Sequence, residues 1–172
     1  EAHQWEMPHV LLGVQDPVGV GLIRNYEIPQ KGVLNLHAAP LDYERCVTVF
    51  KEVVPTAKVV LLPHDASRGA DGFDADRDNL ARLLEKSGII VRRPALNREG
   101  DVVEQLLPYL AEADVLWSVN EPMLQIHARR ISKICAKNSV LYCASELASV
   151  FQGADMGWGD SGSILGNYAG VV

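Results

Sequence analysis

Short apolar runs that each end in polar or glycine-rich residues constrain the fold of this chain more than any other feature. The first run, His9–Val14, is followed by Gln15, Asp16 and a Gly-Val-Gly turn. Similar runs span residues 59–63, 89–93, 115–119 and 140–143. Helical periodicity and short connections separate these runs, which is typical of an α/β fold with a parallel sheet flanked by helices.

Polar side chains follow the carboxyl ends of the runs, where ligands bind in open parallel sheets. Trp158, flanked by two glycines, is the aromatic residue that we expect to reach a ligand, whereas Trp117 lies within a run and is expected in the core. The sequence therefore predicts a small-molecule binding cleft. Its polar candidates are Gln15, Asp16, His64, Asp65, Asn120, Glu121, Ser145 and Glu146.

Four helices follow from apolar periodicity and from cap residues. They are expected near residues 42–54, 73–87, 101–110 and 122–137. Asp42 and Asp101 are suited to N-caps, and Gly88 to a left-handed terminator. Pro108 should end or kink the third helix, whereas Pro122 suits the first position of the fourth.

Composition excludes several classes of protein. With 172 residues, 48% of them hydrophobic, the chain can bury a real core in one or two domains. A net charge of -6 and a pI near 5.3 argue against nucleic acid or anionic membranes as partners. The apolar runs are far shorter than the roughly 20 residues that span a bilayer. The chain opens at Glu1 without a signal peptide, and we interpret it as a processed or trimmed product.

The three cysteines have no spacing typical of a metal site. Cys46 and Cys135 fall on apolar helix faces, and Cys143 ends an apolar run. We expect buried free thiols, with a disulfide between two of them as the alternative in an oxidising compartment. His127 lies at helical spacing among apolar residues, so a packed or half-exposed histidine is expected there. We predict neither a metal ion nor a cofactor.

Two motifs suggest enzymes but lack the required context. Gly159-Asp160-Ser161-Gly162 resembles the nucleophile segment of chymotrypsin-like proteases, yet that fold is an all-β double barrel. Asp160 or Ser161 is better suited to an N-cap. Gly19-Val20-Gly21 suggests a dinucleotide turn, but Arg24 occupies the third glycine position, which disfavours NAD. A hydrolase or transferase using His64 or Ser161 remains an alternative, as does a regulatory domain without a ligand.

The order and spacing of several segments resemble those of ABC-transporter substrate-binding proteins of the tryptophan/tyrosine type. The segments begin with the loop Asp16-Pro17-Val18-Gly19-Val20-Gly21 and the pair Asn35-Leu36. They continue with Pro55-Thr56-Ala57-Lys58, which opens the next strand, and with Ala144-Ser145-Glu146 followed by Gly153-Ala154. Two departures are His37-Ala38, where a Thr-Gly pair is usual, and Ser161, where a tyrosine is usual.

This resemblance implies a periplasmic-binding-protein-like fold of two Rossmann-like lobes with a ligand held between them. Residues 1–36 would end the first lobe, residues 37–143 would form the second, and residues 144–172 would return to the first. One lobe would then be complete and the other partial, and a second copy would complete it if the chain is whole. The implied function is binding of an amino-acid-like solute in the periplasm or elsewhere outside the cytoplasm, for an ABC permease or a derived sensor.

Overall fold

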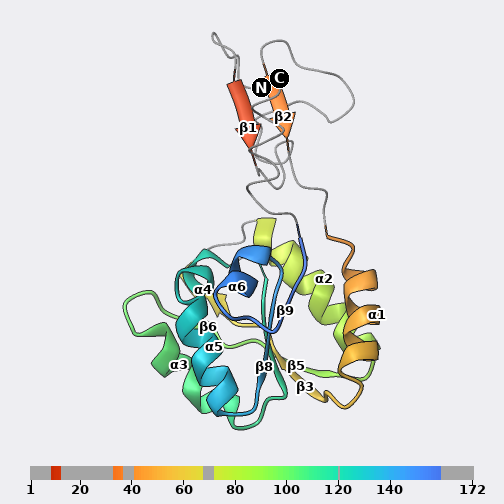
Figure 1. Ribbon diagram of the computed structural model, residues 1–172, viewed down its shortest axis with the longest axis vertical. Helices are drawn as coiled ribbons and strands as arrows, with labels where there is room; N and C mark the ends of the chain where they lie inside the picture. Colours follow the sequence, from red (N-terminus) through yellow and green to blue (C-terminus); the bar gives the residue numbers. More distant parts are fainter. Residues whose placement is uncertain (1–8, 13–32, 37–40, 68–71, 120, 160–172) are drawn as a thin grey trace. The chain divides into compact units, whose positions relative to one another are not determined.

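The computed structural model describes residues 9–12, 33–36, 41–67, 72–119 and 121–159 (Figure 1). The chain divides into two compact units, one made of residues 1–40 and 160–172 and the other of residues 41–159. In the first unit, strand β1 (His9–Leu12) pairs in parallel with β2 (Val33–Leu36). The lobe boundaries predicted from the sequence, after residues 36 and 143, remain a prediction. The second compact unit also contains residues 144–159, which that prediction assigns to the segment returning to the first lobe.

The second unit is built on a five-stranded sheet in which every strand is parallel to its neighbours. The strand order is β5-β3-β7-β8-β9. A short parallel pair, β4 and β6, extends the ladder of β3 and β5, since the Leu62 N–H donates to the Arg92 carbonyl at 2.8 Å. The bounds are β3 (Val59–Leu61), β4 (His64–Asp65), β5 (Ile90–Arg92), β6 (Ala95–Leu96), β7 (Val115–Ser118), β8 (Leu141–Ala144) and β9 (Met156–Gly157).

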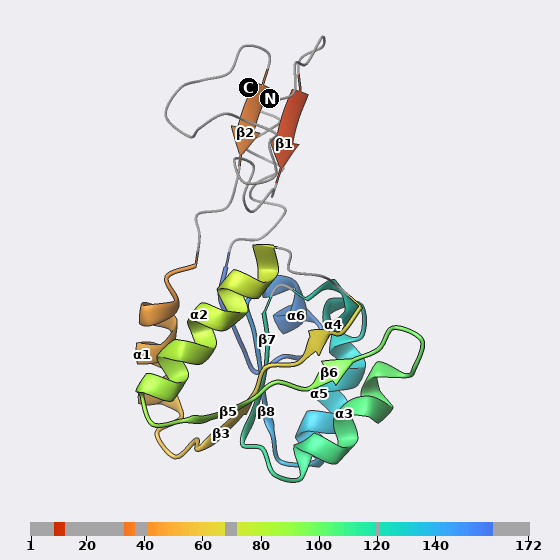
Figure 2. The same cartoon turned by 180° about the vertical axis from the view of Figure 1, so that it is seen from behind.

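Helices cover both faces of this sheet. Helices α1 and α2 lie on one face, and α3 and α5 on the other (Figure 1, Figure 2). Neighbouring strand residues face opposite layers: Val60 packs with α1 and α2, whereas Leu61 packs with α3 and α5. The helices are α1 (Tyr43–Val53), α2 (Gly72–Lys86), α3 (Val102–Leu110), α4 (Pro122–Ile126), α5 (Ala128–Lys137) and α6 (Leu147–Phe151).

The caps predicted at Asp42 and Asp101 and the left-handed terminator predicted at Gly88 are confirmed. The Asp42 carboxylate accepts the Arg45 N–H at 3.0 Å, and the Asp101 carboxylate accepts the Val103 N–H at 2.9 Å. Gly88 follows α2 with a φ of +83°, a left-handed conformation that a side chain would strain. These residues fix where α1, α2 and α3 begin or end.

The single helix predicted over residues 122–137 is wrong. The structure has two helices there, because His127 leaves the helical conformation with φ -103° and ψ 8°. The His127 N–H donates to Leu124, three residues back, so the four-residue ladder is interrupted. His127 itself is half-buried, as expected. Pro108 lies inside α3 and does not end it, since the helix continues to Leu110.

All three cysteines are buried and free, as the sequence predicts. Burial raises the pKa of Cys135 to about 12, so this thiol is inert at neutral pH. Trp117 is fully buried, which confirms its place in the core. Within the described parts of the chain, no helix is long and apolar enough to cross a bilayer.

Two aspartates tie neighbouring strands together where the strands begin. Asp114, just before β7, accepts the backbone N–H groups of Lys58 and Val59 at 2.7 and 2.9 Å through the same oxygen. Asp155, just before β9, accepts the Tyr142 N–H of β8 at 2.8 Å. Each carboxylate therefore replaces a missing ladder bond and fixes the register of two strands.

Replacing Asp114 by alanine tests this role. We expect Asp114→Ala to lower the free energy of unfolding by about 2 kcal/mol, because two backbone donors lose a charged acceptor. Urea denaturation followed by circular dichroism measures the change. Glu112→Ala is the matched control, since Glu112 forms only an exposed ion pair with Arg92 and should cost less than about 1 kcal/mol. Equal costs for the two variants would contradict the assignment.

Candidate ligand-binding site

The order of the strands defines where a ligand is expected. From β3 the chain crosses first to β5 on one side and then to β7 on the other, so the direction of winding reverses between β3 and β7. Ligands of open α/β sheets bind outside the carboxyl ends of the strands at such a reversal. His64 and Asp65 follow β3 at this point, and Glu121 follows β7.

Asp65 is buried and its carboxylate is fully engaged. One oxygen accepts the Ser67 N–H at 2.9 Å and the Ser67 hydroxyl at 2.6 Å, and the other accepts the Arg98 Nε–H. Burial raises the pKa of Asp65, but the hydrogen bonds from Ser67 and Arg98 outweigh it and hold the pKa below its usual range. Asp65 therefore orders the loop after β4.

Glu121 links the two strand ends at the reversal. Its side chain is buried, and its Oε2 accepts the backbone N–H of Asp65 at 3.3 Å. Pro122 then begins α4, as predicted. His64 is half-buried beside them.

Ser145 and Glu146 follow β8 and form a second polar group. The Glu146 Oε1 accepts the hydroxyl of Ser149, one turn later in α6. Burial raises the pKa of Glu146 to about 7, although hydrogen bonds from Ser149 and Gln125 oppose the rise. Neither the other carboxylate oxygen, Oε2, nor the Ser145 hydroxyl has a hydrogen-bond partner among the described residues.

Tyr43, the first residue of α1, belongs to this second group and was not predicted. It is 3% exposed, and burial, followed by the charge of Asp76, raises the pKa of its phenol. The Ser145 hydroxyl lies close enough to lower that pKa, yet the Tyr43 hydroxyl makes no hydrogen bond of normal geometry to a described residue. Its position directly after the Asp42 N-cap was the signal, because a helix that precedes a strand starts at the carboxyl edge of a parallel sheet.

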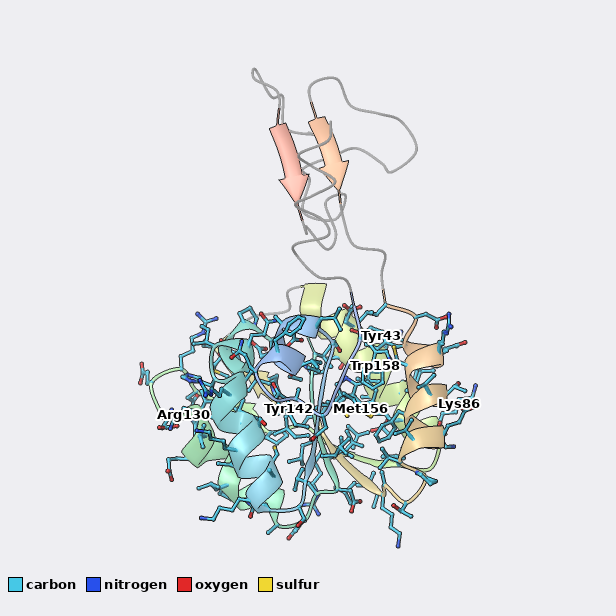
Figure 3. All side chains as sticks on the ribbon, in the orientation of Figure 1. Tyr43, Lys86, Arg130, Tyr142, Met156 and Trp158 are labelled. Atoms are coloured by element: carbon cyan, nitrogen blue, oxygen red, sulfur yellow. The ribbon has the colours of Figure 1, made fainter. Side chains whose placement is uncertain are left out.

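Three aromatic rings pack against one another beside these polar groups. Trp117 lies 4.6 Å from Trp158 with an interplanar angle of 15°, and 5.3 Å from Phe50 at 55°. The backbone N–H of Trp158 donates to the Ala144 carbonyl at 3.1 Å, which holds Trp158 beside the end of β8. Tyr43 and Trp158 come close together on the α1 side of the sheet (Figure 3). Trp158 is half-buried, so part of its ring remains open.

Glu146 is hydrogen-bonded to a buried polar network formed by Ser118, Tyr142 and Ser149. The hydroxyls of Ser118 and Tyr142 lie 3.4 Å apart, and Ser149 is also bonded to Tyr142. Burial raises the pKa of Tyr142 to about 12, against these two hydrogen bonds. Tyr142 is therefore neutral at physiological pH and neighbours Glu146 without adding a charge.

The described candidates thus form two groups. Asp65 and Glu121 lie together with Ser67 and Arg98, which the sequence did not indicate because the pairing of Asp65 with Arg98 joins residues far apart in the chain. The second group contains Ser145, Glu146 and Trp158 with the additional Tyr43. No group of three or more metal-binding side chains occurs among the described residues. The candidates Gln15, Asp16 and Asn120, and the motif residues Asp160 and Ser161, lie outside the described residues.

The described sheet is parallel and doubly wound, and buried polar groups lie at its carboxyl edge, where ligands of such α/β sheets bind. No protein-family profile matches the chain. Among curated proteins, a "Tyrosine-binding protein" of Clostridioides difficile (strain R20291) is 24% identical over 149 residues, which are 87% of this chain and 42% of that protein.

Three solved structures share the fold. A domain from Streptococcus pneumonia in complex with L-Trp has a TM-score of 0.75 at 16% identity and covers 96% of this chain and 57% of its own. A ligand-free, open substrate binding protein from Clostridium difficile has a TM-score of 0.71 at 22% identity, covering 95% and 54%. A conserved domain protein from Vibrio cholerae has a TM-score of 0.73 at 18% identity, covering 91% and 53%.

These comparisons confirm the resemblance to substrate-binding proteins and the periplasmic-binding-protein-like fold. The chain spans about half the length of the structures and 42% of the curated relative. The similar proteins whose function is stated are binding proteins.

The engaged carboxylate of Asp65 gives a pH-dependent prediction. We expect Asp65→Asn to lower the free energy of unfolding at pH 7 by about 1.5–3 kcal/mol, because charged hydrogen bonds to Ser67 and Arg98 are lost. The folded protein holds the pKa of Asp65 low, so this stabilisation is present above the unfolded pKa of about 3.9 and is lost as the pH falls through the folded pKa.

Urea denaturation between pH 7 and pH 3 therefore measures a difference between wild type and Asp65→Asn that shrinks on acidification. Asp78→Asn is the control, since Asp78 forms an exposed pair with Arg93 at 2.5 Å and should cost less than about 1 kcal/mol. A difference for Asp65→Asn that stays constant with pH would contradict the assignment.

Proposed function

We propose that this chain belongs to a protein that binds an amino-acid-like solute outside the cytoplasm and presents it to an ABC transporter or to a sensor derived from one. The solute is held at the carboxyl edge of the five-stranded sheet. Binding, and no chemical conversion, is the activity. A membrane complex or a signalling module then reads the liganded state.

The observation that carries this proposal is a set of buried polar atoms without hydrogen-bond partners, which lies beside the stacked rings of Trp117 and Trp158. Tyr43, Ser145 and Glu146 each have a buried oxygen without a hydrogen-bond partner among the described residues. Buried polar atoms are nearly always satisfied in proteins, and those that are not commonly face a ligand or water. Trp158, stacked on Trp117, offers a flat apolar surface next to them. Polar groups that converge beside an apolar wall are the usual features of a site for a small organic molecule.

The comparisons support the amino-acid character of the solute. The curated relative is called a tyrosine-binding protein, and one structure with the same fold holds L-Trp. An aromatic amino acid combines a planar ring, which suits Trp158, with charged groups, which suit Glu146 and the hydroxyls around it. L-tyrosine and L-tryptophan are therefore the first solutes to test.

Isothermal titration calorimetry on the complete gene product tests the proposal. We expect L-tyrosine or L-tryptophan to bind, and a thermal shift to rise with ligand concentration because ligands stabilise only the folded state. Trp158→Ala should weaken binding about tenfold, since a stacking partner worth about 1 kcal/mol and its apolar contact are lost. Tyr109→Ala is the matched control, because Tyr109 lies near the end of α3 away from this edge.

No binding of any amino acid would overturn the proposal. A panel that also contains sugars and nucleosides shows whether the site takes another solute. Equal losses for Trp158→Ala and Tyr109→Ala would remove Trp158 from the site and leave the rest of the proposal to the ligand panel.

A further inference from the structure

The buried oxygens beside β8 that lack a hydrogen-bond partner indicate which chemical group of the ligand binds there. Tyr43 and Ser145 are 3% and 5% exposed, and their hydroxyls lie near each other, but neither makes a hydrogen bond of normal geometry to a described residue. Glu146 adds a carboxylate oxygen in the same condition. Buried polar atoms without a hydrogen-bond partner destabilise a fold, so these neighbouring oxygens indicate that a ligand meets them.

The charge around these oxygens indicates the sign of the ligand group. The carboxyl groups of Asp76 and Glu146 both raise the pKa of Tyr43, as a negative charge does. The two side chains that hydrogen-bond to the Glu146 carboxylate, Ser149 and Gln125, are both neutral. The site is therefore suited to a cation and repels an anion.

We propose that Tyr43, Ser145 and Glu146 form the subsite that takes the ammonium group of the solute, and that binding of the ammonium releases the proton of the Glu146 carboxyl group to the solvent. This inference rests on the proposed function and names the part of the ligand that the site recognises. An ammonium group has three donors in a compact arrangement, which matches three acceptors. A carboxylate group of the same solute has to lie elsewhere.

The surrounding residues hold Glu146 in place for this role. Ser149 donates to its Oε1 and Gln125 also hydrogen-bonds to the carboxylate, which leaves Oε2 for the solute. Ser149 is in turn bonded to Tyr142 in the buried network under the site. Because both supporting residues are neutral, they orient the carboxylate without neutralising its charge.

The release of a proton from Glu146 follows from the surroundings of its carboxyl group. Among the described residues, the groups that act on it are Tyr43 from α1, Tyr142 from β8, Ser149 from α6 and Gln125 from α4, and all are neutral near pH 7. Burial raises the pKa of Glu146 from 4.5 to about 7, so its protonated and ionised forms coexist near neutral pH. A bound ammonium favours the ionised carboxylate and releases that proton.

Isothermal titration calorimetry in buffers of different ionisation enthalpy measures how many protons are released when the solute binds. With L-tyrosine or L-tryptophan, we expect release of a fraction of a proton per ligand near pH 7, and we expect this fraction to grow toward pH 6 and shrink toward pH 8. Glu146→Gln should abolish the release and weaken binding about 10- to 100-fold. Glu112→Gln, an exposed acid at the opposite edge, is the matched control and should change neither quantity.

Analogues without the amine separate recognition from a general structural effect. We expect 3-(4-hydroxyphenyl)propionate and indole-3-propionate to bind wild type far more weakly than the amino acids, and Glu146→Gln to lose little affinity for them. Equal losses for amino acid and analogue would show that Glu146 only supports the fold. Should Glu146→Gln fail to fold, Tyr43→Phe and Ser145→Ala, each lacking one acceptor, are expected to lower amino-acid affinity selectively.

The ligand-free protein provides an independent measurement. Because the folded pKa of Glu146 lies above its unfolded value, folding binds protons between about pH 4.5 and pH 7, and the stability contributed by the protonated form is lost as the pH rises through that window. Glu146→Gln should remove this part of the pH dependence of unfolding.

The outcomes separate the two proposals. Amino-acid binding without proton release, or with proton uptake, overturns the ammonium subsite and leaves the proposed function intact; uptake would indicate that a protonated Glu146 donates to the solute. Absence of binding by every amino acid overturns both.

Discussion

The parallel pairing of β3 with β7 is the constraint on which the rest of the unit depends. It joins strands that are separated in sequence by α2, β5 and α3, and it creates the reversal of winding at which polar residues collect. Its register places Val60 opposite Val115, so that alternate residues of both strands face the same helices. A slip by one residue would turn each apolar set to the wrong layer. The Asp114 carboxylate opposes such a slip by binding two consecutive N–H groups at the start of β3.

Much of this architecture was predictable because it depends on local patterns. A strand buried on both faces is apolar throughout, and β7 is buried at every position. N-caps act through hydrogen bonds two or three residues along the chain, so Asp42 and Asp101 are recognisable without a structure. The break at His127 was missed because the residues on both sides keep helical spacing, and the change of a single backbone conformation leaves no mark in that pattern.

The site was predictable only in part, for a related reason. Residues that follow strands, such as Glu146 and Trp158, can be assigned to one edge from the sequence, since parallel strands bring their carboxyl ends together. The partners of these residues depend on tertiary contacts. Tyr43 comes from a helix before the sheet begins, and Arg98 comes from the loop after β6. No spacing rule connects Arg98 with Asp65 or Tyr43 with Glu146, because their distance in space is set by how the helices pack.

Two acidic residues at the same edge show how the environment determines their roles. Asp65 is buried, but hydrogen bonds from Ser67 and Arg98 stabilise its charge and occupy both of its oxygens. Glu146 is half-buried, and its donors Ser149 and Gln125 are neutral, so that one buried oxygen keeps no hydrogen-bond partner among the described residues. The fold therefore lowers the pKa of Asp65 and raises that of Glu146. A carboxylate whose charge is already stabilised gains little from a cationic ligand, whereas one that is poorly stabilised gains much. By this reasoning Asp65 holds the loop in place, and Glu146 supplies the favourable interaction that selects a cation.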